Sequence, residues 1–125
     1  MRKKMIKGFE SITSPLTDTD KRVLVPALAD LLRWRVGNSL AITNTELRAQ
    51  LFSKGLHCSD AKLRALVNYI RINGVVERLI ATSQGYYVAT SGNELADYCD
   101  SLRERESAIR AVRQALEGQN TKSLF

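Results

Sequence analysis

The stretch 43–89 constrains the fold of this chain more than any other part, because four short elements follow one another there almost without linkers. Two segments with apolar residues at helical spacing come first, at 43–54 and 59–72, and each is followed by a glycine that favours a helix end. Two apolar, β-branched runs follow at 75–81 and 86–89, with turn residues between them. This order predicts two helices joined by a tight turn and then a β-hairpin.

Hydroxyl residues mark where both helices begin. Thr43 and Glu46 have the spacing of a capping box, and Ser59 is the expected N-cap of the next helix. In the helix that follows Thr43, the expected buried residues are Leu47, Leu51 and Phe52.

An earlier helix is predicted from Thr17 to about Val36, with Asp20 in the acidic role of a capping box. Pro26 lies inside its apolar pattern and is expected to kink the helix, or to split it near Leu24–Val25, because proline cannot donate a backbone hydrogen bond. We expect Trp34 to pack part of its ring on a neighbour. The segment 39–42 is a candidate for a brief strand that pairs with the hairpin.

The helix over 59–72 has two different faces when each residue is placed 100° after the last. The face expected in the core carries Leu63, Leu66, Val67 and Ile70. The opposite face carries Ala61, Ala65, Asn68 and Ile72, flanked by Lys62, Arg64, Tyr69 and Arg71. Small residues with arginines at the edge suit a helix that enters a DNA groove, whereas the alternative is an amphipathic helix with a solvated polar face.

A last helix is expected from Ser91 or Asn93 to about Glu117, with Gly118 as its end. Apolar residues recur every seven positions, with Tyr98 and Val112 at the partner positions of the heptad and Arg105 as an interruption. Such a seam packs either on the body of the domain or on a second copy, and we favour a homodimer. The expected dimer contacts are Leu95, Leu102, Ile109, Val112 and Leu116.

Charge is unevenly distributed along the 125 residues. The net charge is +6, and 1–76 holds 13 Lys+Arg against 6 Asp+Glu, whereas 77–125 holds 6 against 7. A basic half that contains the two short helices favours a polyanionic partner, because neutralising phosphates releases counterions. The alternative is a basic surface that only aids solubility.

The termini and the cysteines indicate the cellular compartment in which the protein is expected. We expect a basic tail at 1–15, either an arm that touches phosphates or an idle end, and a disordered tail at 119–125. No apolar run has the length of a signal peptide or a membrane span, so neither secretion nor membrane insertion is expected. Cys58 and Cys99 are expected to be reduced thiols in the cytoplasm, and with His57 they are too few for a zinc site.

The stretch 62–112 resembles small winged-helix proteins of bacterial phages and prophages. The matching features are Arg64, Asn73-Gly74, Gly85-Tyr86 and a final arginine-rich helix, in that order. The resemblance implies a DNA-binding accessory of a mobile element, in transcriptional control or in replication initiation.

Element order and resemblance together predict a mainly α (α+β) fold. The expected architecture is a winged helix-turn-helix over 16–90, with a two-stranded wing hairpin, and a long C-terminal helix over 91–118. The expected partners are double-stranded DNA and a second copy of the chain, in the cytoplasm with the nucleoid. The expected DNA contacts are Lys54, Ser59, Lys62, Arg64, Ala65, Asn68, Arg71, Ser83 and Gln84, with Arg2, Lys3 and Lys4 as further phosphate contacts.

The sequence gives less support to other classes of function. A winged-helix module that binds a protein through the last helix is the alternative hypothesis. Catalysis is not expected, because the chain has one His, no phosphate-binding glycine loop and no nucleophile elbow, and the strand tyrosines Tyr86 and Tyr87 are more typical of packing residues. We expect no cofactor, no metal and no small-molecule ligand. The cognate DNA site and any effector do not follow from the sequence.

Overall fold

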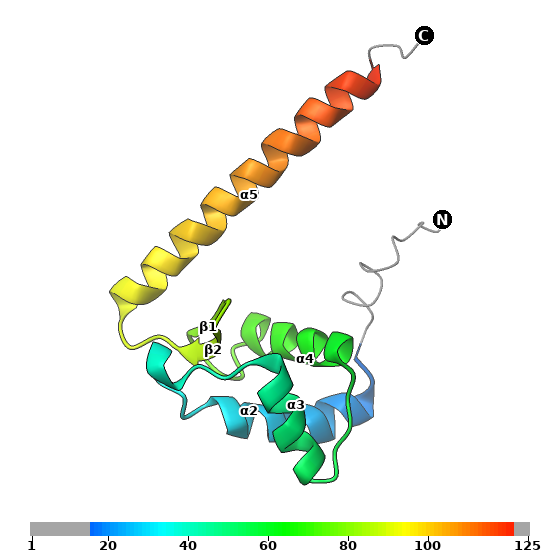
Figure 1. Ribbon diagram of the computed structural model, residues 1–125, viewed down its shortest axis with the longest axis vertical. Coiled ribbons are helices and arrows are strands. Elements are labelled where there is room, and N and C mark those ends of the chain that lie inside the picture. The colour runs from blue at the N-terminus through cyan, green and yellow to red at the C-terminus, as the bar shows by residue number, and fades with distance from the viewer. Residues whose placement is uncertain (1–15, 122–125) are drawn as a thin grey trace. The chain divides into compact units, whose positions relative to one another are not determined.

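The structure is a computed structural model that describes residues 16–121. The protein is mainly helical, with one two-stranded antiparallel sheet and a long C-terminal helix (Figure 1). It divides between Thr90 and Ser91 into two units. The elements in chain order are the π-helix η1 (Asp20–Leu24), α2 (Val25–Leu32), the 3₁₀ turn η2 (Asn38–Leu40), α3 (Asn44–Ser53), α4 (Asp60–Ile72), β1 (Leu79–Thr82), β2 (Gly85–Val88) and α5 (Gly92–Thr121).

A reciprocal capping box opens the first helix. The Asp20 N–H donates to Thr17 Oγ1 at 3.0 Å, and the Thr17 N–H donates to Asp20 Oδ2 at 2.9 Å. At Val25 the N–H donates five residues back, to the Asp20 carbonyl, and the helix then continues as α2 with proline in its first turn. The change near Leu24–Val25 is one of hydrogen-bond pattern, from π to α, beside Pro26, which has no N–H to continue the ladder; the chain stays helical through this point.

This helix ends at Leu32, so the prediction that it continues to about Val36 is wrong. Val36 forms an isolated bridge with Val88 instead: the Val88 N–H donates to the Arg35 carbonyl at 2.7 Å, and the Gly37 N–H donates to the Val88 carbonyl at 2.9 Å. Pairing with a strand removes these residues from the helix. Trp34 packs against Arg35, whose guanidinium carbon lies 4.4 Å from the ring centroid, and 56% of Trp34 stays exposed.

The caps of the next two helices are as predicted. Thr43 and Glu46 form a full capping box on α3, and the Ser59 hydroxyl accepts the Lys62 N–H on α4. Leu47 and Leu51 of α3 are fully buried, but the prediction for Phe52 is wrong, since it is 62% exposed. Five residues after Leu47 the side chain has turned about 140° away from that buried position, and the Phe52 ring contacts His57 edge-on at 4.7 Å between centroids.

The hairpin is shorter than the sequence suggests. β1 and β2 pair from Leu79↔Val88 to Thr82↔Gly85, so the turn consists of Ser83 and Gln84. The prediction that the first strand begins at Val75 is wrong, because 75–78 forms bends and turns and Arg78 takes a positive φ of 61°.

Ile42 pairs with the outer edge of the hairpin. Its N–H donates to the Tyr86 carbonyl at 3.0 Å, and the Tyr86 N–H donates back to the Ile42 carbonyl at 2.8 Å. The predicted brief strand is therefore a single antiparallel bridge at Ile42, while Asn38–Leu40 forms a 3₁₀ turn. β2 is hydrogen-bonded on both of its edges.

The core of this unit lies between the three helices and the hairpin (Figure 1). All four residues predicted for the core face of α4 are buried. The largest side chains that are less than 2% exposed are Leu28, Leu32, Ile42, Leu47, Leu51, Leu63, Leu66, Val67, Ile70 and Ile80. Close packing of these side chains holds α4 in one orientation, so that the face of α4 without core residues points away from the core.

α5 forms the second unit. The Ser91 hydroxyl accepts the Glu94 N–H at 3.2 Å, so Ser91 rather than Asn93 is the cap. The helix continues through Gly118 to Thr121, and the predictions of an end at Gly118 and of disorder over 119–121 are wrong. A glycine weakens a helix by about 1 kcal/mol without ending it. The predicted tails at 1–15 and 122–125 lie outside the described residues.

Gly85 is required by the close approach of another backbone. Its φ is +126°, and a Cβ placed there would lie 2.5 Å from the Ile42 carbonyl oxygen. We expect Gly85→Ala to lower the free energy of unfolding by roughly 2–4 kcal/mol, since it adds a backbone clash to conformational strain. Urea denaturation measures the change.

Gly74→Ala is the matched control, because Gly74 also has a positive φ, +67°, but has no atom within 4 Å of its Cβ position. It should cost about 1–2 kcal/mol from backbone strain alone. Equal losses for the two variants would show that the Ile42–Gly85 approach does not constrain the fold.

Candidate nucleic-acid interface

The exposed face of α4 carries Arg64, Asn68 and Ile72, as the sequence predicts. Ala65, however, is only 8% exposed, which leaves little of its surface for the predicted contact with DNA. A methyl group is short, and the longer side chains one helical turn away on either side, Lys62 and Tyr69, extend beyond it. The half-exposed Ala61 is thus the small residue that remains accessible on this face, among polar and longer side chains.

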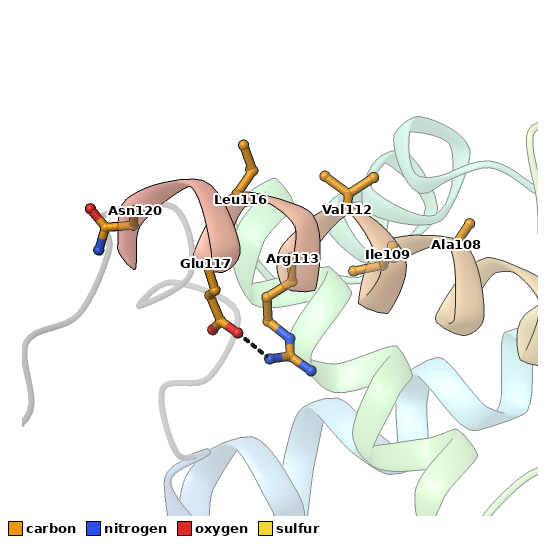
Figure 2. A pocket seen from close by; sticks show the side chains of 7 residues that line it. All are labelled: Ala108, Ile109, Val112, Arg113, Leu116, Glu117 and Asn120. Carbon is orange, nitrogen blue, oxygen red and sulfur yellow. Dashed lines mark hydrogen bonds and ion pairs between the residues drawn. The ribbon is translucent and has the colours of Figure 1, made fainter. Parts of the chain in front are cut away.

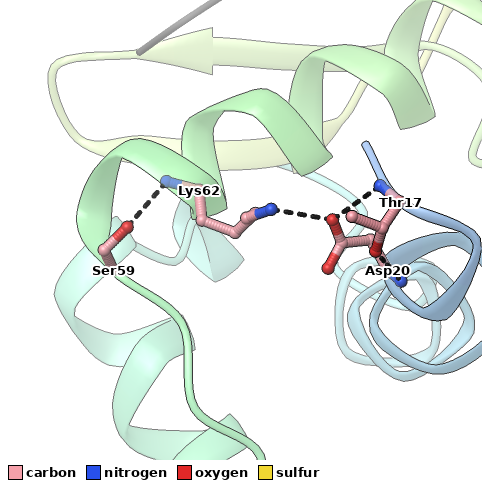
Figure 3. Close-up of polar contacts among 4 residues, drawn as sticks. All are labelled: Thr17, Asp20, Ser59 and Lys62. Carbon is pink, nitrogen blue, oxygen red and sulfur yellow. Dashed lines mark hydrogen bonds and ion pairs between the residues drawn. The ribbon is translucent and has the colours of Figure 1, made fainter. Parts of the chain in front are cut away.

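Lys62 binds the first helix. Its Nζ lies 2.7 Å from Asp20 Oδ2, and the same carboxylate oxygen accepts the Thr17 N–H (Figure 3). The Asp20 side chain is 10% exposed and that of Lys62 is 35% exposed. The hydrogen bond from Lys62, followed by the one from the Thr17 backbone, lowers the pKa of Asp20. The predicted DNA-contacting lysine thus joins the N-terminal end of α4 to the first helix.

Arg64 is held in place but remains accessible. Its Nε donates to Asp60 Oδ2 at 2.9 Å, one turn earlier on α4, and both side chains are about half exposed. This bond, which raises the pKa of Arg64, uses one of the five N–H donors of a guanidinium. The ion pair therefore orients the arginine along the helix and leaves donors for a ligand.

Arg71 joins α4 to the hairpin. The side chain is half-buried, and its Nε donates to the Leu79 carbonyl at 3.2 Å. The first residue of β1 is thereby tied to the last turn of α4. Of the two arginines of α4 predicted to contact DNA, Arg64 lies on the exposed face and Arg71 braces the hairpin.

Sequence reasoning assigned Tyr86 to packing and missed its polar contacts. The Tyr86 hydroxyl donates to Asn44 Oδ1 at 2.7 Å, at the first residue of α3. Burial raises the pKa of Tyr86, whereas the positive charges of Arg64 and Arg71 favour a lower pKa of this hydroxyl. The alternation of the strand could have indicated this role, because neighbouring strand residues face opposite sides of a sheet. Tyr87 is buried, so Tyr86 lies on the other side, where it is half-buried.

The remaining predicted contacts lie at three separate places. Lys54 is exposed at the C-cap of α3, and the Ser59 hydroxyl is occupied in capping α4. Ser83 and Gln84 are exposed at the hairpin tip, where the Gln84 N–H donates to Thr82 Oγ1 at 3.1 Å. Arg2, Lys3 and Lys4 lie outside the described residues.

Within residues 16–121 no group of three or more His, Cys, Asp or Glu side chains is arranged to hold a metal ion. In the same range, no helix combines the length and apolar character needed to cross a membrane. Cys58 and Cys99 are both free thiols, and burial raises the pKa of Cys58.

Comparisons of the chain with protein-family models, with curated proteins and with solved structures found no match.

We expect Lys62→Met to lower the free energy of unfolding by about 1–3 kcal/mol at pH 7, because a mostly buried carboxylate loses its charged partner. The exposed Lys54 provides the control: Lys54→Met should change stability by less than about 0.5 kcal/mol. Similar losses in urea denaturation for the two variants would contradict a structural role for Lys62.

The contact between Asp20 and Lys62 also predicts how the stability of the fold depends on pH. The pKa of Asp20 is lower in the folded than in the unfolded protein, so its contribution is complete above the unfolded pKa of about 4 and is lost as pH falls through the folded value. Stability measured between pH 7 and pH 2 should decline less in Lys62→Met than in the unchanged protein. An equal decline would rule out the Asp20–Lys62 pair as its cause.

Proposed function

We propose that this chain is a non-catalytic winged-helix protein that binds double-stranded DNA, with α4 in the major groove and the β1–β2 hairpin beside it. One observation carries the proposal: α4 keeps one polar face out of the core, and Arg71 ties the hairpin to the end of that helix through the Leu79 carbonyl. A helix presented next to a hairpin is the arrangement with which winged helices contact DNA.

The order and pairing of elements support this architecture. A helix, a one-residue bridge at Ile42, two capped helices and a hairpin follow one another within 75 residues or so, the size of a small DNA-binding domain. The bridge to Tyr86 places the chain before α3 against the hairpin, and Arg48 links α3 to the turn before α4 through its hydrogen bond to the Cys58 carbonyl at 3.0 Å.

Side-chain placement divides the predicted contacts into two roles. Arg64 and Asn68 are the candidates for base edges, since Arg binds guanine and Asn binds adenine in the major groove. Lys54 is a candidate phosphate contact, as are the basic residues near the N-terminus. Lys62 and Arg71 position α4 and the hairpin. Ser83 and Gln84 are uncharged, so the wing should add little to affinity.

The resemblance to phage and prophage proteins suggests a cellular role as a transcriptional regulator or a replication accessory, in the cytoplasm with the nucleoid. In this proposal the chain acts as a homodimer through α5. Two-fold pairing of such modules is common because operator half-sites are often related by two-fold symmetry.

A second candidate function is favoured by one observation. α5 exposes Ile109, Val112 and Leu116, which suit a protein partner. If a protein partner is the only ligand, the chain should show no salt-dependent binding to DNA.

Arg64→Ala should weaken binding to a selected DNA site by about 1–3 kcal/mol and relax base preference at one position. Arg33→Ala is a closely matched control, since Arg33 is equally exposed and pairs with Asp30 at 2.8 Å, as Arg64 pairs with Asp60 at 2.9 Å. Site selection from a random library, followed by fluorescence anisotropy, measures both effects. Equal losses on the selected and random DNA would remove Arg64 from base recognition.

Lys54→Ala should weaken binding to all sequences alike and lower the slope of log K against log salt by roughly one, as expected for one lost phosphate contact. An unchanged salt slope would place Lys54 outside the interface.

A further inference from the structure

The last turns of α5 present an unpartnered apolar stripe. Ile109, Val112 and Leu116 are 68%, 60% and 57% exposed. In Figure 2, Ala108, Val112 and Leu116 project from one side of the helix, while Arg113 and Glu117, joined by an ion pair of 3.1 Å, project from another. The surface is thus an apolar strip with charges along its edge.

A helix with this surface is stabilised only weakly by its own contacts. Every residue from 99 to 120 is exposed, and the ion pairs along the helix contribute about 0.2–0.5 kcal/mol each. Isolated helices are marginal in water, and most helical stability comes from burying an apolar face. The heptad spacing of the stripe suits another helix as the partner.

We propose that α5 pairs with α5 of a second copy in antiparallel orientation, with the two-fold axis between Arg110 and Ala111. The proposal specifies the dimer contact of the proposed function and does not depend on DNA binding. The overlap spans about 20 residues on each chain, or roughly 30 Å at 1.5 Å per residue.

The apolar positions favour this orientation over a parallel one. Leu102, Ile109 and Leu116 occupy one core position of the heptad, and Arg105 and Val112 occupy the other. In a parallel pair, like positions meet, so Arg105 would face Arg105 of the second copy in the seam. In the antiparallel pair, Arg105 faces Leu116 and packs its aliphatic stem there, while Ile109 and Val112 form two symmetric central layers.

The charges beside the seam fit the same register. On one flank, Glu106 faces Arg113 of the second copy, and symmetry repeats this pair once. The other flank holds only small residues in the overlap centre, Ala108 and Ala115, which permit close approach. A parallel pair would place Ala108 beside Arg113 and Ser101 beside Glu106, with no opposite charges meeting.

Thiol cross-linking of the full chain tests the orientation. One protein carries Leu102→Cys and another, with a mass tag, carries Gln119→Cys, both with Cys58→Ser and Cys99→Ser to remove the native thiols. In the antiparallel pair Leu102 faces Gln119 of the second copy and lies about 25 Å from Leu102 of that copy. A short bifunctional thiol reagent should therefore cross-link the mixture, and neither protein alone.

Cross-linking of the Leu102→Cys protein with itself would overturn the antiparallel arrangement. A charge exchange gives an independent measurement. Glu106→Arg and Arg113→Glu should each weaken the dimer about tenfold, and the double variant should recover most of the loss, because the exchanged charges face each other again. Glu104→Arg is the control, because Glu104 does not lie on the flank of Glu106. It should change the dissociation constant of the dimer by no more than about twofold.

Failure of the double variant to recover the dimer would contradict the register, and a chain that sediments only as a monomer would overturn the pairing altogether. Binding of the same samples to a random-sequence duplex separates the proposals. Parallel cross-links together with retained DNA binding would refute only the antiparallel pair, whereas antiparallel cross-links without DNA binding would refute only the DNA-binding function.

Discussion

The pairing of Ile42 with Tyr86 is the contact on which the arrangement of the first unit depends. Two hydrogen bonds join these residues, and the approach is close enough that Gly85 has no room for a side chain. The bridge holds β2 from its outer edge, while β1 holds it from the other. As a result, the segment that leads into α3, the hairpin and Tyr86 all lie in fixed relation to the exposed face of α4.

Local patterns in the sequence predicted the elements well where a single physical rule decided them. The capping residues Thr17, Thr43, Ser59 and Ser91 begin the helices as expected, and the first helix changes from π to α hydrogen bonding beside Pro26, which has no N–H. The errors have two different causes, one tertiary and one local. Pairing with Val88 ends the first helix early, and helix geometry turns Phe52 out of the core despite its apolar character.

The candidate interface was harder to predict, because the sequence shows which charged residues share a helix and not which partner each one finds. Arg64 was assigned to the exposed face correctly. Lys62 and Arg71 have similar chemistry, yet the first is occupied by Asp20, 42 residues earlier, and the second bonds to a strand carbonyl. Asn44 and Tyr86 join the site through a contact between residues that are also 42 apart, which no local pattern reveals.

The proposed DNA-binding surface is the exposed face of α4, with the hairpin tip beside it. The most direct measurement is a titration of the full chain with a random-sequence duplex at low and then high salt, followed by amide chemical shifts. We predict shift changes concentrated in Asp60–Ile72 and at Ser83 and Gln84, which diminish as salt is added. No change at low salt, or changes confined to α5, would contradict it.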